Sequence, residues 1–133
     1  MRYMIILLVG SLWISTAIAQ NFPNRPVRML IPFPPGSAAD IIARAMEPAM
    51  REKLGQALVI DNRGGAGGNI AAELTAKAVP DGYTIFMGTI GTQAINYSLY
   101  SKLGYHPLNS FTPAMLLNSS PERCTEVPAP ELL

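Results

Sequence analysis

Two glycine-bearing turns hold the residues with the clearest chemical potential in this sequence. The first, Phe33–Asp40, follows an apolar run that ends at Ile31, and the second, Gly64–Asn69, follows the apolar run 58–60. Each turn leads into a predicted helix, and the first N–H groups of a helix lack partners within it, which favours bound anions. Two such turns in one small α/β unit therefore predict a site for a carboxylate or a phosphate at the strand ends.

A third segment, Gly88–Asn96, adds hydroxyl groups, an amide and free backbone N–H groups after another predicted strand. Ligands of open α/β sheets usually lie at such strand ends. Each feature also has a structural interpretation. The glycines can serve a tight turn, Asp40 can interact with the helix dipole, and Thr92 can cap a helix. Arg63 can pair with an anion or face solvent.

Nucleotide binding and catalysis both lack their signatures. A dinucleotide fingerprint that starts at Gly65 has Ile70 where a Gly or Ala is needed, and no phosphate-binding Gly-Lys-Ser/Thr is present. His106 is the single histidine, in a turn context, and no cluster has metal-ligand spacing or forms a nucleophile elbow. We therefore predict a protein that is not an enzyme, with no catalytic residue, no metal and no cofactor.

Composition indicates one globular domain at most. The chain has 133 residues, of which 49% are hydrophobic and 14% charged. A formal net charge of +1 gives no reason to expect nucleic acid or an anionic membrane as a partner. A single cysteine, Cys124, allows no intrachain disulfide and is interpreted as an incidental thiol.

The N-terminus resembles a signal peptide. Arg2 precedes the apolar run Met4–Ile14, and Ala17-Ile18-Ala19 fits the small-x-small pattern, so we expect cleavage after Ala19. A retained anchor is the alternative, but the apolar run is shorter than the about 20 residues that span a bilayer. The expected location is outside the cytoplasm, which means the periplasm if the source is Gram-negative.

Alternating elements predict a mostly parallel sheet flanked by helices, because strands joined through helices require right-handed crossovers. The expected strands are 27–31, 57–60, 83–88 and 111–117, and the expected helices are 37–54, 69–78 and 94–100. In the first helix we expect an apolar face that includes Ile41 and Ile42, and a kink or restart at Pro48. The second should bury Ile70 and Leu74, with Ala71 and Ala78 as further candidates. Residues 118–133 are predicted to be an unstructured, divergent tail.

The motifs resemble those of the tripartite tricarboxylate transporter substrate-binding family, also called the Bug receptors. The similarity covers about residues 22–120 and rests on these stretches: Pro26–Arg28, Pro32–Gly36 with Asp40, Asp61–Arg63, Gly65–Ala71, Pro80–Thr84, Gly88-Thr89, Ala94–Asn96 and Phe111–Pro113. The resemblance implies a periplasmic binding protein-like lobe. Such a receptor closes on a small carboxylate and delivers it to integral membrane transporter subunits, and we expect it to be a monomer.

The resemblance also assigns ligand-binding residues to the three loops. They are Pro35, Gly36, Ser37 and Asp40 in the first, Ala66, Gly67, Gly68 and Asn69 in the second, and Thr89, Gly91, Thr92 and Gln93 in the third. The sequence departs from the family pattern at several places: Ser37 replaces a usual Gly, Gly64 a usual Pro, Gln93 a common His and Tyr97 a common Pro.

Chain length limits what the resemblance implies. Family members carry about two domains of chain, so residues 20–117 are expected to form a partial first lobe with the second lobe missing. One lobe supplies only part of the contacts of a cleft, and we expect weak or absent binding by this chain alone. The alternative is a non-functional, poorly folded receptor fragment with exposed strand edges.

Overall fold

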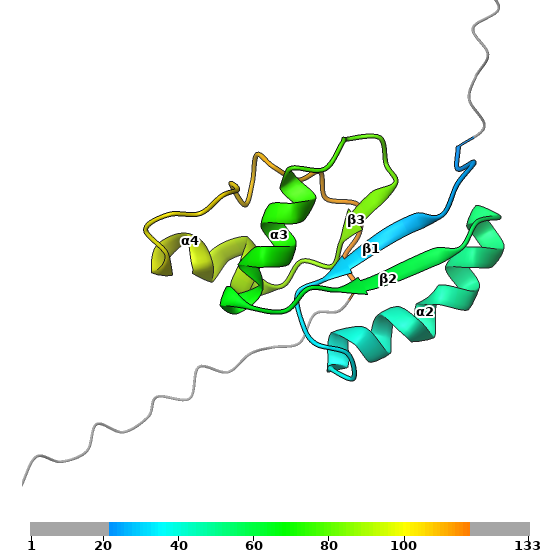
Figure 1. The fold of residues 1–133 in the computed structure, drawn as a ribbon, viewed down its shortest axis with the longest axis horizontal. Helices are drawn as coiled ribbons and strands as arrows, with labels where there is room; N and C mark the ends of the chain where they lie inside the picture. Colours follow the sequence, from blue (N-terminus) through cyan, green and yellow to red (C-terminus); the bar gives the residue numbers. More distant parts are fainter. Residues whose placement is uncertain (1–21, 118–133) are drawn as a thin grey trace, which may run out of the picture.

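A three-stranded parallel sheet organises the computed structural model, which describes residues 22–117. The strand β1 (Val27–Ile31) lies between β2 (Leu58–Asn62) and β3 (Thr84–Phe86) (Figure 1). Val27 pairs with Leu58 on one side, and Arg28 pairs with Thr84 on the other. The predicted α/β fold with a parallel sheet is confirmed.

Helical segments connect the strands and follow the last of them. They are α2 (Ala38–Leu54), the 3-10 turn η1 (Ala66–Gly68), α3 (Asn69–Ala76), the π-helical turn η2 (Gly91–Ile95) and α4 (Asn96–Leu99). The chain moves from β1 to β2 in one direction and then back across β1 to β3. With right-handed crossovers, this reversal places α2 and α3 on opposite faces of the sheet (Figure 1).

The apolar core lies between the sheet and α2. Alternate residues of a strand point to one face, and Val27, Met29 and Ile31 are all buried there. Ala43 of α2 packs on this row, together with Leu58 from β2. Each large aliphatic side chain buried in this way stabilises the fold by about 1.5–3 kcal/mol.

The buried face of α2 differs from the predicted one. Ile41 and Ile42 are 61% and 37% exposed, whereas Ala43 is fully buried. A small side chain at Ala43 lets the helix axis approach the sheet closely, so the neighbouring isoleucines lie to the sides. The helix also continues through Pro48 without a restart, because that turn is exposed and water can take the place of the missing N–H.

A similar correction applies to α3. Ala71 and Ala72 are completely buried, whereas Ile70 and Leu74 remain 45% and 44% exposed. Small residues again make the close contact with the sheet. The prediction that Ala71 is buried is confirmed, and the prediction that Ile70 and Leu74 form the buried face is wrong.

The segment 111–117 is not a strand. Phe111 instead packs its ring against Phe86 of β3, with 5.5 Å between ring centroids, and against Tyr105 at 5.7 Å. These aromatic contacts bury the segment's one large ring against side chains rather than along a strand edge. The last predicted helix is present but begins earlier, at Gly91, and ends at Leu99.

Two predicted segments lie outside the described residues: the signal peptide 1–19 with its cleavage site after Ala19, and the divergent tail 118–133. Across residues 22–117, no helix has both the length and the apolar character needed to cross a membrane.

Candidate functional site

The three predicted loops leave the same edge of the sheet, because parallel strands have their carboxyl ends together. Side chains and backbone tie the loops to one another. The side-chain amide of Asn62 donates to the Phe33 carbonyl at 3.1 Å, and a Cβ added to Gly68 would lie 2.7 Å from Thr92 Cγ2 and 2.8 Å from Pro32 Cβ. The structure therefore brings the loop segments 33–40, 64–69 and 88–93 together at one place.

The first loop is organised around Asp40, which is 3% exposed. Ser37 caps α2, since its Oγ accepts from the Asp40 N–H at 3.3 Å. Asp40 Oδ2 accepts from the Gly36 N–H and from Arg44 Nε, both at 2.9 Å. The hydrogen bond from Arg44, followed by the one from Gly36, lowers the pKa of Asp40 to about 2. Asp40 is therefore ionised at neutral pH.

The other carboxylate oxygen of Asp40 is an open acceptor. Oδ1 is buried and has no hydrogen-bond partner among the described residues. A buried anionic oxygen is costly without a donor, which a water or a ligand N–H or O–H can provide. Pro35 and Gly36 beside it are exposed, and Ser37 is half-buried.

The second loop needs left-handed backbone in a confined space. Gly65, Gly67 and Gly68 have φ of 121°, 63° and 89°, and Ala66 joins them at 48°. Gly68 has the strictest requirement, because a side chain there would clash with two neighbouring loops. Ala66 and Gly67 are exposed at the predicted site, whereas Gly68 and Asn69 are buried.

A buried network of neutral groups joins the second loop to the third. Asn69 Oδ1 accepts from Asn96 Nδ2 at 2.6 Å and from the Tyr105 hydroxyl at 3.0 Å. Asn96 Nδ2 also donates to the Gly67 carbonyl at 2.9 Å, and the Tyr105 hydroxyl lies 2.8 Å from the Thr92 carbonyl oxygen. Burial raises the pKa of Tyr105, so its hydroxyl stays a donor. Asn69 therefore holds the second loop to the third through buried hydrogen bonds.

The third loop divides into a buried part and an accessible part. Thr92 is fully buried, and its Oγ1 accepts from the Thr89 N–H at 3.0 Å and donates to the Thr89 carbonyl at 3.1 Å. These bonds hold Thr92 against Thr89 of the same loop, and η2 has no side-chain cap. Thr89, Gly91 and Gln93 are half-buried. The Gln93 side chain lies against Gly88, where an added Cβ would be 2.9 Å from Nε2.

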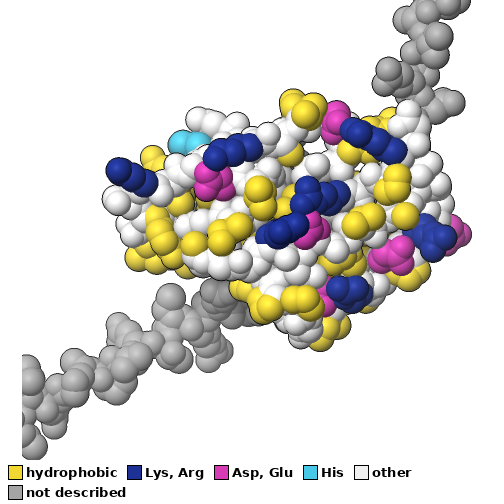
Figure 2. All heavy atoms as spheres, in the orientation of Figure 1, with side chains coloured by type: hydrophobic (Ala, Val, Ile, Leu, Met, Phe, Trp, Pro, Cys, Tyr) yellow, Lys and Arg dark blue, Asp and Glu magenta, His cyan; other side chains and the backbone are white. Residues whose placement is uncertain are grey.

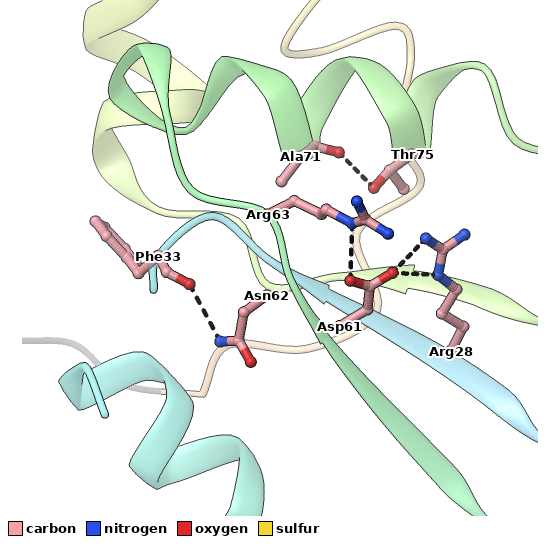
Figure 3. Close-up of polar contacts among 7 residues, drawn as sticks. All are labelled: Arg28, Phe33, Asp61, Asn62, Arg63, Ala71 and Thr75. Carbon is pink, nitrogen blue, oxygen red and sulfur yellow. Dashed lines mark hydrogen bonds and ion pairs between the residues drawn. The ribbon is translucent and has the colours of Figure 1, made fainter. Parts of the chain in front are cut away.

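The cationic side chains near the strands point elsewhere. Arg63 Nε donates to Asp61 Oδ1 at 2.8 Å, and Arg28 binds the other oxygen of the same carboxylate (Figure 3). Asp61 lies on the face of β2 opposite to Asn62, because successive side chains alternate. Basic and acidic side chains lie beside one another on the visible face (Figure 2). Arg63 therefore faces the surface, the second of its two interpretations.

Sequence reasoning missed the supporting residues Arg44, Asn62 and Tyr105. Arg44 had a signal, since it stands four residues after Asp40, the spacing of an ion pair on a helix. Tyr105 had none, because its partners are 36 and 13 residues away. His106 lies in a turn, where its Nδ1 accepts from the Leu108 N–H at 3.2 Å. Within residues 22–117, no group of three His, Cys, Asp or Glu side chains is arranged to hold a metal ion.

Two surface hollows lie at the amino edge of the sheet, away from the three loops. One is beside the last turn of α2 and includes Gly55 and Ala57, and the other includes Pro26 and Thr84. Neither is lined by a predicted ligand-binding residue.

The fold is an open α/β sheet with helix-initiating loops at its carboxyl edge. The periplasmic binding protein BugD has the same fold, with 43% identity and a TM-score of 0.66 over 69% of this chain and 30% of its own. MatC from Rhodopseudomonas palustris, solved with bound malate, is 42% identical with a TM-score of 0.66 over 69% of this chain and 31% of its own. Another R. palustris protein, solved with adipate, is 44% identical with a TM-score of 0.62 over 65% of this chain and 29% of its own.

The family model of the tripartite tricarboxylate transporter family receptor matches residues 42–129. Protein BugT of Bordetella pertussis is 35% identical over 123 residues, which cover 87% of this chain and 38% of BugT. The chain belongs to this family of transporter receptors, the Bug receptors. It spans about a third of the length of the curated relatives it matches.

Proposed function

We propose that this chain forms one wall of the ligand site of a periplasmic solute-binding protein that captures a small carboxylate for a tripartite tricarboxylate transporter. The observation that carries the proposal is Asp40: a buried carboxylate, neutralised on one oxygen and open on the other, at the start of α2 between converging loops. Malate and adipate in the neighbouring structures indicate the ligand class.

The physical basis is capture of an anion by backbone groups. The N-termini of α2 and α3 open at the same edge of the sheet, and each carries partial positive charge. Asp40 would repel a ligand carboxylate in direct contact. An ordered water that donates one proton to Oδ1 and the other to the ligand carboxylate removes that conflict and satisfies the buried oxygen.

The remaining parts of the proposal concern the whole receptor. We propose a periplasmic location, integral membrane transporter subunits as partners, a monomeric state and binding without chemical conversion, with family membership as the support. Export through residues 1–19 is proposed from the N-terminal residue pattern. A second wall is expected from chain beyond this sequence, because ligand sites of this kind enclose most of the ligand. Binding by this chain alone is therefore expected to be weak.

The test is a titration of the ¹⁵N-labelled chain with malate and adipate, followed by amide chemical shifts. We expect saturable shifts confined to residues 35–40, 64–69 and 88–93, and none with adipamide, which lacks the charges. Ser37→Asp keeps a good helix cap but adds a negative charge, so it should abolish the shifts. Ser37→Asn keeps the cap without the charge and should retain them.

Shifts absent from all three loops, or equal with adipamide, would contradict carboxylate capture. A thermal melt separates this proposal from the alternative of a non-functional fragment. A cooperative transition that moves upward with malate supports a folded lobe that binds, because a ligand of the native state raises its stability. A broad transition that ignores the ligand supports the alternative.

A further inference from the structure

We infer that Arg44 is a positioning residue of the ligand site. It binds Asp40 Oδ2 and balances the charge of the carboxylate, which leaves the buried Oδ1 to accept a hydrogen bond from a water or a ligand in the site. The inference deepens the proposed function and rests on it for its role in binding. Arg44 lies on α2, one helical turn after Asp40.

The carboxylate is used asymmetrically. Arg44 Nε and the Gly36 N–H both donate to Oδ2, each at 2.9 Å, whereas Oδ1 has no partner among the described residues. Two donors on one oxygen fix the plane of the carboxylate, because a partial rotation would break both bonds, whereas a half-turn only exchanges two equivalent oxygens. Arg44 therefore sets where the free oxygen lies for a water or a ligand.

The charge of the site has the same origin. The groups that lower the pKa of Asp40 are Arg44 of its own helix, the Gly36 N–H of the preceding loop and, more weakly, the amide of Asn62 from β2. The Asn62 amide donates its hydrogen bond to the Phe33 carbonyl and not to Oδ1. Arg44 is the charged one. Its side chain is 56% exposed while that of Asp40 is 4% exposed, so the guanidinium reaches the buried anion from the solvent side. An approaching ligand carboxylate then meets a neutral pair.

Removal of Arg44 should change the chemistry of the site as well as its shape. An Asp40 without its cation would have a pKa nearer to its ordinary value of 3.8 and would become a proton donor at a higher pH. A protonated Asp40 can donate directly to a ligand carboxylate. Acid would therefore strengthen binding in the variant in a pH range where it has no such effect on the native chain, because Asp40 stays ionised there.

The experiment follows the ¹³Cγ resonance of Asp40 between pH 2 and 6 in four ligand-free, full-length proteins. They are the native chain and the variants Arg44→Gln, Arg44→Lys and Arg51→Gln. Arg51 is the matched control, since it lies on the same helix but in its last turn. We expect Asp40 to titrate near 2 in the native chain and in Arg51→Gln. It should titrate closer to 3.8 in Arg44→Gln and between the two in Arg44→Lys, which restores the charge without the fixed Nε geometry.

Binding of malate by the same four proteins at pH 4 and pH 7 completes the test. The inference predicts that malate affinity at pH 7 falls at least several-fold in Arg44→Gln and is partly restored in Arg44→Lys. The control Arg51→Gln should bind malate as the native chain does. An Asp40 titration that is unchanged in Arg44→Gln would overturn the inference. If the native chain binds no malate but Arg44→Gln shifts the titration, the proposed function fails while the control of Asp40 by Arg44 stands.

Discussion

The two sides of the candidate site are held by different physical means. The first loop depends on a charge: Arg44 and the Gly36 N–H hold the Asp40 carboxylate, and the guanidinium is more than half exposed. The second and third loops depend on neutral groups, Asn69, Asn96 and Tyr105, which are buried and bonded to one another. The stability of the first side should therefore depend on pH and salt. The stability of the second should depend on each buried hydrogen-bonding group, such as the hydroxyl of Tyr105.

The two means of stabilisation suit different roles: the first loop can adjust, and the second and third loops give rigid support. The Arg44–Asp40 pair fixes the carboxylate while it is intact, but its guanidinium is exposed, so salt, solvent or a ligand can compete for it and the first loop can adapt. A buried network cannot, because each group that loses its partner remains unsatisfied. The second and third loops are therefore expected to form the rigid side of the site.

The largest effect should come from Gly68→Ala on the rigid side. Its φ of 89° disfavours an L-residue, and the new Cβ would meet Thr92 Cγ2 at 2.7 Å and Pro32 Cβ at 2.8 Å. Strain and overpacking together should cost about 3 kcal/mol of unfolding free energy. Gly36→Ala is the control, with a similar φ of 83° and open space around it, and should cost about 1 kcal/mol. Equal losses in urea unfolding would mean that the loops do not pack closely.

The next effect tests the neutral network through Tyr105→Phe. The variant keeps the ring and removes the hydroxyl that lies 3.0 Å from Asn69 Oδ1 and 2.8 Å from the Thr92 carbonyl. The single hydroxyl proton serves one of these acceptors at a time, and Asn69 Oδ1 keeps its bond from Asn96, so one buried acceptor loses its donor. The loss should cost about 1–2 kcal/mol in urea unfolding. Tyr97→Phe, on a ring that is 59% exposed, should change the stability little. If Tyr105→Phe left the unfolding free energy unchanged, the argument that the buried network makes this side rigid would fail.

A smaller loss is expected on the adaptable side from Ser37→Ala. The substitution removes the Oγ that accepts from the Asp40 N–H at 3.3 Å and should cost about 1 kcal/mol. Ser37→Asn restores a capping oxygen and should recover most of the loss in a thermal melt. A failure of asparagine to rescue would show that Ser37 contributes through packing and not through the cap.

The smallest effect should be confined to acid. Asp40 has a folded pKa of about 2 against an ordinary value of 3.8, so the unfolded chain binds the proton first. Its contribution is complete above about pH 4 and is lost as the pH falls through about 2. Asp40→Asn keeps the shape but cannot titrate, so its unfolding free energy should fall less steeply between pH 4 and pH 2.

A residual slope should remain in Asp40→Asn. Arg28, and after it Arg63, also lowers the pKa of Asp61, and that pair lies away from the loops. Asp61→Asn should therefore reduce the acid slope without an effect on carboxylate binding. The same slope in Asp40→Asn and in the native chain would contradict the charge-based account of the first loop.

Sequence patterns predicted the elements better than the faces they bury. Apolar runs ended by Pro and Gly predicted strands at 27–31 and 57–60, which the structure has at 27–31 and 58–62. The polar residues after Gly36 predicted a helix from about residue 37, and α2 begins at Ala38. The large residues Ile41, Ile70 and Leu74 were expected inside and lie outside, because alanines make the closest approach to the sheet. Helical periodicity shows which residues share a face of the helix, but it does not determine which of several apolar faces packs against the sheet.

The order of the chain by itself determined the α/β class, the parallel sheet and the convergence of the three loops at one edge, because alternating strands and helices with right-handed crossovers leave few other arrangements. The support of those loops was decided only by tertiary structure. Asn69 and Tyr105 are 36 residues apart, and their bond exists because the folded chain returns to the same edge of the sheet. The open oxygen of Asp40 is likewise a product of packing, since local sequence shows that Arg44 can reach the carboxylate but not which oxygen stays buried and free.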